Sequence, residues 1–401
     1  MPTLWSSIAV AKPRISQLAT IMVWLERASE CPLSLSLFQS YMPNPAEQGA
    51  TSQVLALFLT RAHLWRHIEF NFKSFRASDN ALSQAQLSNL PATPMLESVY
   101  LEMSNWDATF VDRVWHSIHA LPTVRRIHWD SDYECRGIPA HTPWSQLTHL
   151  TFPSSPNLSQ NQLLEILREC HQLVELDWDI TMCSESSIQT LFLRVTLPTL
   201  RVLRLHVNGM NNPGPFTEHL SLPSLTSISI LQHFRSPAPR LIGWLKDLLV
   251  RSACRLEALS LTDWMLGEDE LIEFLASPET QHLVKLSLML RKITDRMAKF
   301  LTVDKETGVL LPNLQVLFLP DYEISEGSLF SIIASRLPVL KTIRIPNSDM
   351  LLARDLPALR ILLSTGCDFH LLLEDQIDGK LVERRLGSKV LTRLDYYSFQ
   401  F

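Results

Sequence analysis

The chain has 401 residues, of which 46% are hydrophobic and 19% charged, and its formal net charge is −5 at pH 7. This composition supports a large apolar core and excludes a chain that stays disordered for lack of core residues. A mildly acidic chain without runs of like charge also lacks the basic surface of a nucleic-acid-binding protein. We therefore expect no nucleic-acid partner.

The sequence indicates neither a membrane span nor export. No apolar run reaches the roughly 18 residues that cross a bilayer. Residues 18–25 follow Lys12 and Arg14 and resemble a signal peptide, but Trp24 and the next two charges favour a short amphipathic helix. The six cysteines form no Cys-x-x-Cys pair and fit no zinc spacing. Such cysteines are typical of reduced, mostly buried thiols, so we expect an intracellular protein, cytoplasmic or nuclear, with no membrane partner.

Residues 1–93 contain three weak copies of a short strand pattern, about 30 residues apart. Between the second and third copies, Pro43, Pro45 and Gly49 predict a loop over Tyr41–Thr51. The end of a repeat array must cover an exposed apolar edge, so we interpret residues 1–93 as atypical N-terminal repeats and a cap. The copies are Trp5/Ile8/Val10, Leu33/Leu35/Leu37 and Trp65/Ile68/Phe70.

A clearer motif, Leu-x-x-Leu-x-Leu, recurs from Leu96 onward at intervals of 19 to 31 residues. Most intervals fall within the 20–29 residues of a leucine-rich repeat. The alternating last three positions put two apolar side chains on one face of a short strand. The copies are Leu96/Val99/Leu101, Val124/Ile127/Trp129, Leu147/Leu150/Phe152, Leu173/Leu176/Trp178, Leu200/Leu203/Leu205, Leu225/Ile228/Ile230, Leu256/Leu259/Leu261, Leu283/Leu286/Leu288, Leu314/Leu317/Leu319, Leu340/Ile343/Ile345 and a weaker one at Leu359/Leu362.

Helical spacing fills the intervals between these strands. Residues 111–118 and 188–195 carry apolar side chains at i, i+3, i+4 and i+7, and residues 241–249 form a longer stripe. Shorter helices are predicted near residues 163–167, 271–275, 297–301 and 329–333. A strand, a helix and a parallel strand make a right-handed unit. The pattern predicts an α/β fold, a leucine-rich-repeat solenoid or horseshoe with an inner parallel sheet and outer helices.

This interpretation divides the chain into residues 1–93, leucine-rich repeats over 94–365, and a charged C-terminal cap over 366–401. The turn asparagine of the consensus repeat occurs after one copy, as Asn208, and Asn347 lies one place off. Because the turns and the period are irregular, we expect uneven curvature.

Three framework segments resemble fungal F-box/leucine-rich-repeat proteins: Pro2–Ile8, Trp24–Leu37 and Leu64–Ile68. In that family a similar P-x-LW segment follows the F-box, and a similar WLERS-x-x-CPLSL segment precedes the repeats. The resemblance covers essentially the whole chain. It implies a substrate-recognition arm of a ubiquitin ligase. The F-box itself would lie upstream of Pro2, so binding to the ligase adaptor is expected only if that motif is present there.

Catalytic motifs are not found in the sequence. The chain has no G-x-x-x-x-G-K-[ST], G-x-G-x-x-G, G-x-S-x-G or H-E-x-x-H segment. Asp130-Ser-Asp132-Tyr-Glu134 resembles the start of a calcium loop, but Cys135 stands where the sharp turn needs glycine, which favours a solvated loop. Trp129 and Trp178 occupy leucine positions and are predicted to be core. We expect no enzyme, no cofactor and no metal.

The third, fifth and seventh positions of each motif point to the concave face of the predicted sheet. An acidic row there lies beside a basic one, so Asp177 and Arg204 are expected either to neutralise each other or to form a mixed-charge patch for a protein partner. His128 and His206 alternate with the leucines on predicted strands, which favours surface histidines over catalytic ones. Val316, Phe318 and Met289 add an apolar neighbour, and exposed apolar groups beside charges suit protein recognition. The predicted partner-binding residues are Arg126, His128, Glu175, Asp177, Asp179, Arg204, His206 and Phe318.

Two functions are consistent with these patterns. The first is a protein-interaction module that binds an unidentified protein partner on its concave sheet, as the family resemblance implies for ubiquitin-ligase substrates. The second is a structural or relic repeat scaffold without an F-box and without ligase association. An enzyme with an unfamiliar site is a third, weaker interpretation.

Overall fold

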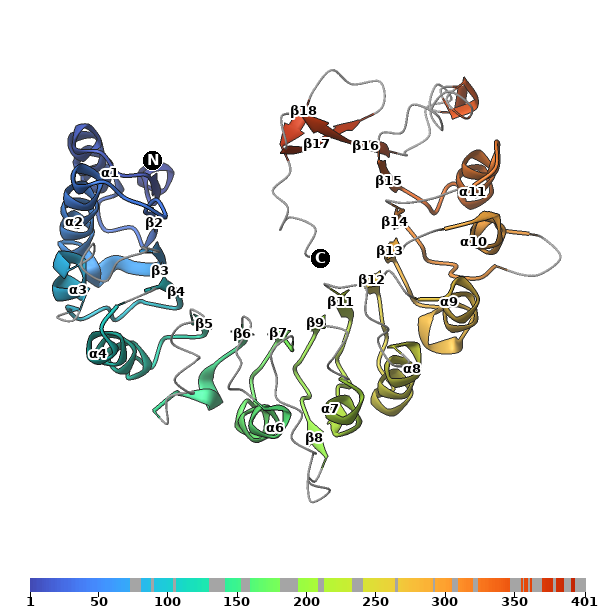
Figure 1. Cartoon of the computed structure of the whole chain (residues 1–401), viewed down its shortest axis with the longest axis horizontal. Coiled ribbons are helices and arrows are strands. Elements are labelled where there is room, and N and C mark those ends of the chain that lie inside the picture. Colours follow the sequence, from blue (N-terminus) through green and yellow to red (C-terminus); the bar gives the residue numbers. More distant parts are fainter. Residues whose placement is uncertain are drawn as a thin grey trace. The chain divides into compact units, whose positions relative to one another are not determined.

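The computed structural model shows a mixed α/β protein that divides into two compact units, Met1–Ile188 and Gln189–Phe401. We call them the N-terminal and C-terminal units and describe each by itself (Figure 1). The structure describes residues 1–72, 81–87, 90–103, 106–129, 141–152, 159–180, 194–207, 213–232, 241–263, 266–290, 293–304, 309–319, 324–346, 355, 357–359, 361–362, 370–377, 380–385 and 391–393.

The N-terminal unit contains a parallel sheet in which each strand pairs with the next one along the chain. Parallel neighbours need a crossover between them, and the intervening helices provide it. The register keeps apolar positions in line, for example Ile8 with Leu35 and Leu150 with Leu176. The strands are β1 (Ser7–Ala11), β2 (Leu33–Phe38), β3 (Trp65–Asn71), β4 (Ser98–Glu102), β5 (Arg126–His128), β6 (His149–Phe152) and β7 (Glu175–Asp179).

The helices of this unit lie on one side of its sheet (Figure 1). In α4 the side chains of Val111, Val114, Trp115 and Ile118 are buried, which confirms the helix predicted from their spacing. The Asp107 carboxylate accepts a hydrogen bond from the Thr109 amide at its N-terminus. The helices are η1 (Pro2–Trp5), η2 (Ile15–Gln17), α1 (Leu18–Ala28), α2 (Pro45–Leu59), η3 (Ala62–Leu64), α3 (Ala81–Leu87), α4 (Ala108–His119), η5 (Trp144–Gln146) and α6 (Gln160–Glu169).

The C-terminal unit repeats the arrangement with a second run of parallel strands and then changes direction. β9 (Val202–Val207), β11 (Ser227–Gln232), β12 (Ala258–Asp263), β13 (Lys285–Leu290), β14 (Val316–Phe318), β15 (Thr342–Pro346) and β16 (His370–Ile377) pair in parallel in that order. β17 (Lys380–Arg385) and β18 (Leu391–Arg393) then follow in antiparallel pairing. A separate two-stranded sheet joins β8 (Val195–Thr196) and β10 (Leu220–Ser221).

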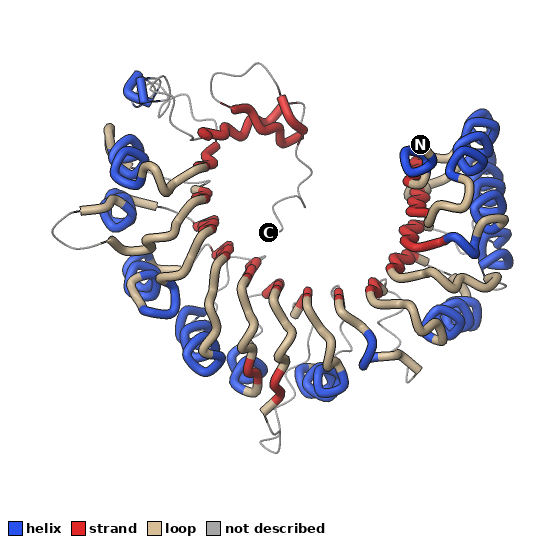
Figure 2. The backbone as a smooth tube through the Cα atoms, turned by 180° about the vertical axis from the view of Figure 1, so that it is seen from behind, coloured by secondary structure: helices blue, strands red, loops and turns tan. Residues whose placement is uncertain are grey.

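The helices of the C-terminal unit also lie on one side of its large sheet (Figure 2). The helices predicted near residues 241–249, 271–275, 297–301 and 329–333 are confirmed, as is the one near 163–167 in the N-terminal unit. The helices are α7 (Gly214–Glu218), α8 (Leu241–Ser252), α9 (Glu268–Leu275), η6 (Pro278–Thr280), α10 (Asp295–Leu301) and α11 (Ser328–Arg336).

The core of each unit lies between its sheet and its helices. On β7, Leu176 and Trp178 are fully buried, whereas the alternate residues Glu175, Asp177 and Asp179 are only half-buried. Trp129, which directly follows β5, is 2% exposed. Trp129 and Trp178 are therefore both core residues, as predicted. Because successive strand side chains point to opposite faces, one side of each sheet packs on helices and the other side is left open.

Three predictions about local structure are wrong. The loop predicted over Tyr41–Thr51 ends at Asn44, because α2 begins at Pro45. Proline fits the first helical turn, where no amide donor is lost, and the Asn44 side chain caps the helix by accepting from the Glu47 amide at 2.9 Å. Gly49 lies inside the helix, where its turn-forming tendency is overridden.

The other two errors exchange a helix and a strand. Val195 was expected at the end of a helix but lies in β8, paired in register with Leu220. Leu359 and Leu362 were expected to form a weak strand copy, yet both are helical, and the next strand is β16. A spacing of three residues suits both one helical turn and the entry to a repeat strand, so a short copy does not separate the two.

Some sequence predictions lie outside the described residues. They are the helical residues 188–192, the calcium-like segment with its neighbour, 130–135, and the turn residues Asn208 and Asn347. Among the described residues, no helix is long and apolar enough to cross a membrane.

Candidate functional site

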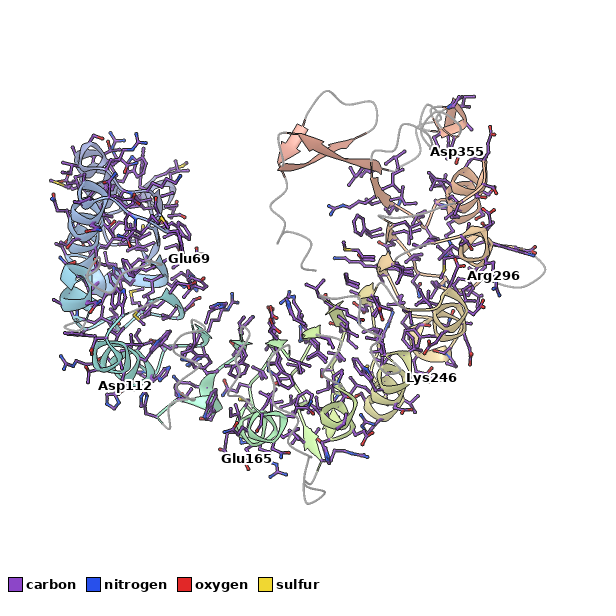
Figure 3. The ribbon with its side chains drawn as sticks, viewed as in Figure 1. Glu69, Asp112, Glu165, Lys246, Arg296 and Asp355 are labelled. Atoms are coloured by element: carbon purple, nitrogen blue, oxygen red, sulfur yellow. The ribbon has the colours of Figure 1, made fainter. Side chains whose placement is uncertain are left out.

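The candidate binding surfaces lie on the open side of the parallel strands in each unit, opposite the helices. Figure 3 shows this division in the N-terminal unit: Glu69 lies on a strand, while Asp112 and Glu165 lie on helices. Glu69, Asp112 and Glu165 are all exposed. The sheet provides a rigid frame, so the register alone fixes which side chains of the open face are neighbours.

Five of the predicted partner-binding residues lie on the open face of the N-terminal unit. Arg126 and His128 come from β5, and Glu175, Asp177 and Asp179 come from β7. The intervening β6 places His149 and Thr151 in register with both neighbours. Two strand spacings separate Arg126 from Glu175, about 10 Å between backbones. The structure therefore brings the predicted cation and the predicted carboxylates onto one surface.

His149 lies between Arg126 and Glu175 in the strand register. Its Nε2 lies 3.9 Å from an oxygen of Glu175, and its Nδ1 lies 2.9 Å from the hydroxyl of Thr148. The Thr148 hydroxyl is within hydrogen-bond distance of one ring nitrogen, and the Glu175 carboxylate lies farther from the other. When His149 is protonated, this contact becomes an ion pair with Glu175.

An aromatic pair lies beside the charges. The rings of Tyr100 on β4 and His128 on β5 are 4.4 Å apart at their centroids and tilted by 38°. The Tyr100 hydroxyl donates to a carboxylate oxygen of Glu102 at 3.1 Å. Burial lowers the pKa of His128, and Asp177 and Glu102 act in the opposite direction. The pair combines apolar rings with hydrogen-bonding groups, a composition found in the energetically important parts of protein interfaces.

The sequence prediction missed the part of this face that precedes β5. Ser36, Glu69, Tyr100 and Glu102 lie on β2, β3 and β4 on the same side, and the Ser36 hydroxyl donates to Glu69 at 3.2 Å. The available signal was the same alternation in the weak copies, where residues between the apolar positions reach the open face. From β3 to β7 this face carries the carboxylates of Glu69, Glu102, Glu175, Asp177 and Asp179.

The remaining three predicted residues lie on the C-terminal unit. Arg204 and His206 come from β9, and Phe318 comes from β14. Phe318 was expected to be an exposed apolar contact, but it is 5% exposed, and Arg204 is 9% exposed. Alternation gives the face of a residue correctly, whereas its exposure also depends on its neighbours in the sheet. Met289 and Val316 are the partly exposed apolar residues there.

The predicted lateral pair of Asp177 and Arg204 joins residues of different units. That pairing stays a prediction. The open face of the N-terminal unit carries several carboxylates. The open face of the C-terminal unit carries Arg204, Lys285 and Arg344.

Other reactive groups of the described chain lie away from the open faces. His119 on α4 and His141 place their Nδ1 atoms 2.9 Å apart. The described residues contain no group of three or more His, Cys, Asp or Glu side chains arranged to hold a metal ion. Burial raises the pKa of the Cys170 thiol to about 12 and that of Cys254 to about 11, so both stay protonated at neutral pH and are poor nucleophiles.

Comparisons with known proteins do not assign the chain to a family. No protein-family model matches it, and no curated protein sequence matches it. The open faces therefore have to be interpreted from their own chemistry.

Proposed function

We propose that this chain is a leucine-rich-repeat solenoid that binds a protein partner on its open sheet faces. The recurrent Leu-x-x-Leu-x-Leu motif and the in-register parallel strands support the repeat interpretation. The single observation that carries the binding proposal is the open face of the N-terminal unit. The tilted ring pair of Tyr100 and His128 lies there among the carboxylates of Glu69, Glu102 and Asp177.

The chemistry of this face favours a protein over other partners. Five carboxylates repel nucleic acid and anionic lipid, while aromatic rings beside charges are typical of protein interfaces. The face extends about 29 Å across its strands and about 13 Å along them, so its area is roughly 400 Å². A stable interface buries about 800 Å² on each partner, so the proposed partner also contacts strand ends or further residues.

We further propose that this binding serves substrate recognition in a ubiquitin ligase. This part rests on the resemblance of Pro2–Ile8 and Trp24–Leu37 to segments of fungal F-box proteins. Association with the ligase adaptor requires an F-box encoded upstream of Pro2. Without it, the alternative is a scaffold that folds without a ligand and has no connection to a ligase.

Proximity labelling with the full chain in cells, compared between variants, tests both parts. The variant Arg126→Glu/Glu175→Lys/Asp177→Lys reverses charges on the open face. The matched control is Glu165→Lys, an exposed position on the outer helix α6 (Figure 3). We expect a set of labelled proteins that the control keeps and the open-face variant loses.

The labelling experiment gives different results if the binding proposal fails and if only the ligase proposal fails. If no labelled protein depends on the open face, the scaffold alternative is correct. If dependent partners appear but neither the adaptor nor a cullin is labelled, including with any longer transcript, the ligase part is wrong and the binding part stands.

A further inference from the structure

The first strand of the N-terminal unit has an unpaired edge. β1 pairs with β2 on one side, and in the part of the chain that the structure describes no strand pairs with its other side. The Ser34 amide donates to the Ser6 carbonyl, and the Lys12 amide donates to the Phe38 carbonyl, both at 2.8 Å. These two bonds fix the ladder, in which every second residue of β1 from Ser6 onward bonds to β2.

The alternate residues Ser7, Ala9 and Ala11 direct their amide and carbonyl groups away from β2. Their side chains are exposed, whereas those of Ile8 and Val10 are buried. The open edge therefore presents three donors and three acceptors, bordered by side chains no larger than serine. Side chains this small leave room for another strand to pair with the edge.

The edge of β1 lacks the features that commonly protect the edge of a sheet. Such edges are protected by charged residues, by proline or by very short strands. β18, the last strand of the C-terminal unit, has three residues and contains Arg393. β1 has five residues and contains neither a charge nor a proline. The adjoining helix η1 contacts β1 and exposes Leu4, which is 72% exposed. This edge is therefore suited to pairing with another strand.

The outward groups of β1 are arranged symmetrically about Ala9. An antiparallel copy of the strand, placed with its Ala9 opposite the first Ala9, brings Ser7 opposite Ala11 and Ala11 opposite Ser7. In this register each facing pair exchanges two hydrogen bonds, so every outward donor and acceptor of both edges has a partner. The two copies are then related by a twofold axis through the Ala9 pair, which is the commonest symmetry of protein dimers.

The cations beside β1 do not oppose this pairing. Lys12 and Arg14 follow the strand, and both are exposed. With Ala9 on the axis, the two copies of Lys12 are separated by about six residues along the joined strands, or about 20 Å. Because this separation exceeds the Debye length of about 8 Å at physiological salt, the repulsion between them is largely screened.

We propose that two copies of this chain associate through β1 as an antiparallel pair centred on Ala9. The inference goes beyond the proposed function, because it concerns the edge of the sheet and not its open face. A five-residue edge is about 17 Å long, so the contact is small beside the roughly 800 Å² that each partner buries in a stable interface. We therefore expect a weak dimer with a micromolar dissociation constant, in which Leu4 of each copy adds apolar area.

Sedimentation velocity with the full chain at about 1 to 100 μM tests the proposal. The wild-type chain should shift from monomer to dimer over this range. Ala9→Lys and Ala9→Glu each place two like charges opposite each other, with α-carbons about 5.5 Å apart, so either variant alone should dimerise at least about tenfold more weakly. An equal mixture of the two variants should dimerise again, because Lys then faces Glu. The matched control is Glu165→Lys, exposed on α6, which should dimerise like the wild type (Figure 3).

A wild-type chain that stays monomeric at about 100 μM overturns the proposal and leaves the edge to an extended segment of another protein. Undiminished dimers in both Ala9 variants, or a mixture of the two that stays monomeric, also overturn it. Because Ala9 is exposed, both variants should keep the wild-type circular dichroism spectrum. None of these results affects the labelling experiment on the open face, so failure here and failure of the proposed function are distinguishable.

Discussion

His119 and His141 place their Nδ1 atoms 2.9 Å apart, and His119 is 4% exposed. Two imidazoles at this distance share a hydrogen bond only if one donates and the other accepts. Burial lowers the pKa of His119 to about 3, and His141 and His116 act in the same direction. Burial therefore keeps His119 neutral in the folded protein at neutral pH.

This relationship predicts that the protein loses stability in acid. His119 has a folded pKa of about 3 and an ordinary value of 6.5, so between these values the unfolded chain binds the extra proton. The contribution is fully present above pH 6.5 and decreases as the pH falls, by at most about 1.4 kcal/mol per pH unit. Urea unfolding between pH 7 and 4.5 measures it. His119→Gln should reduce this pH dependence, and His63→Gln, at an exposed position, should not. An equally steep dependence in His119→Gln would assign the effect to other groups.

Arg336 is predicted to be the most sensitive charged residue of the C-terminal unit. It is 5% exposed, and its guanidinium donates to the carbonyl oxygens of Leu301, Leu310 and Leu311. Burial lowers its pKa to about 10, so the group stays charged at neutral pH. Arg336→Met removes the hydrogen bonds that the guanidinium donates to these three carbonyls and should cost about 3 kcal/mol or more.

Thermal and urea unfolding check this prediction. Arg296→Met is the control, because the Arg296 side chain is 68% exposed in its ion pair with Asp269. An exposed pair contributes up to about 1 kcal/mol, so the control should change little. Equal effects of the two substitutions would contradict the structural role of the buried carbonyl contacts.

Glu268 connects α9 to the start of α10. Its carboxylate accepts from the amide and hydroxyl of Thr294, at 2.8 and 2.6 Å, and from the Met297 amide at 3.3 Å. Glu268→Ala removes these acceptors and should destabilise the protein by about 1–2 kcal/mol, measured by urea unfolding. The control is Glu270→Ala, because Glu270 is exposed and lies two residues after Glu268 on the same helix. A loss no larger than that of the control would show that Glu268 does not cap α10.

Tyr100 is predicted to be a main contact of the proposed partner. It is partly exposed and held by His128 and Glu102. Truncating an interface tyrosine commonly costs 2 kcal/mol or more, roughly a thirtyfold weaker affinity. Tyr100→Ala should show this with the labelled partner in isothermal titration calorimetry, and Tyr100→Phe should lose less because the ring remains. An unchanged affinity for Tyr100→Ala would place the contact elsewhere.

Much of the secondary structure follows from the sequence because two periodicities are strong in it. Leu176 and Trp178 alternate with acidic residues and form a strand, and Val111 to Ile118 follow helical spacing and form a helix. Short segments were less predictable. Leu359 and Leu362 suit both periodicities, and the helix after Asn44 overrode the turn residues Pro45 and Gly49.

The sequence predicted the face of the sheet on which each site residue lies, but not how exposed that residue is. Alternation placed Arg126 and Asp177 on the open face, yet it did not show that Phe318 is buried. Nor did it show that Tyr100 lies against His128, because that contact joins strands 28 residues apart in sequence and depends on the register of β4 and β5. Contacts between neighbouring strands depend on the strand pairing, which a single sequence does not give.

The most direct measurement of the central claim is hydrogen exchange by mass spectrometry on the chain alone and with its labelled partner bound. The account predicts that bound partner slows exchange at the edges and loops of β4 to β7, and that α4 and α6 on the opposite side of the sheet exchange as before. Protection confined to α4 and α6, with β4 to β7 unchanged, would contradict binding on the open face.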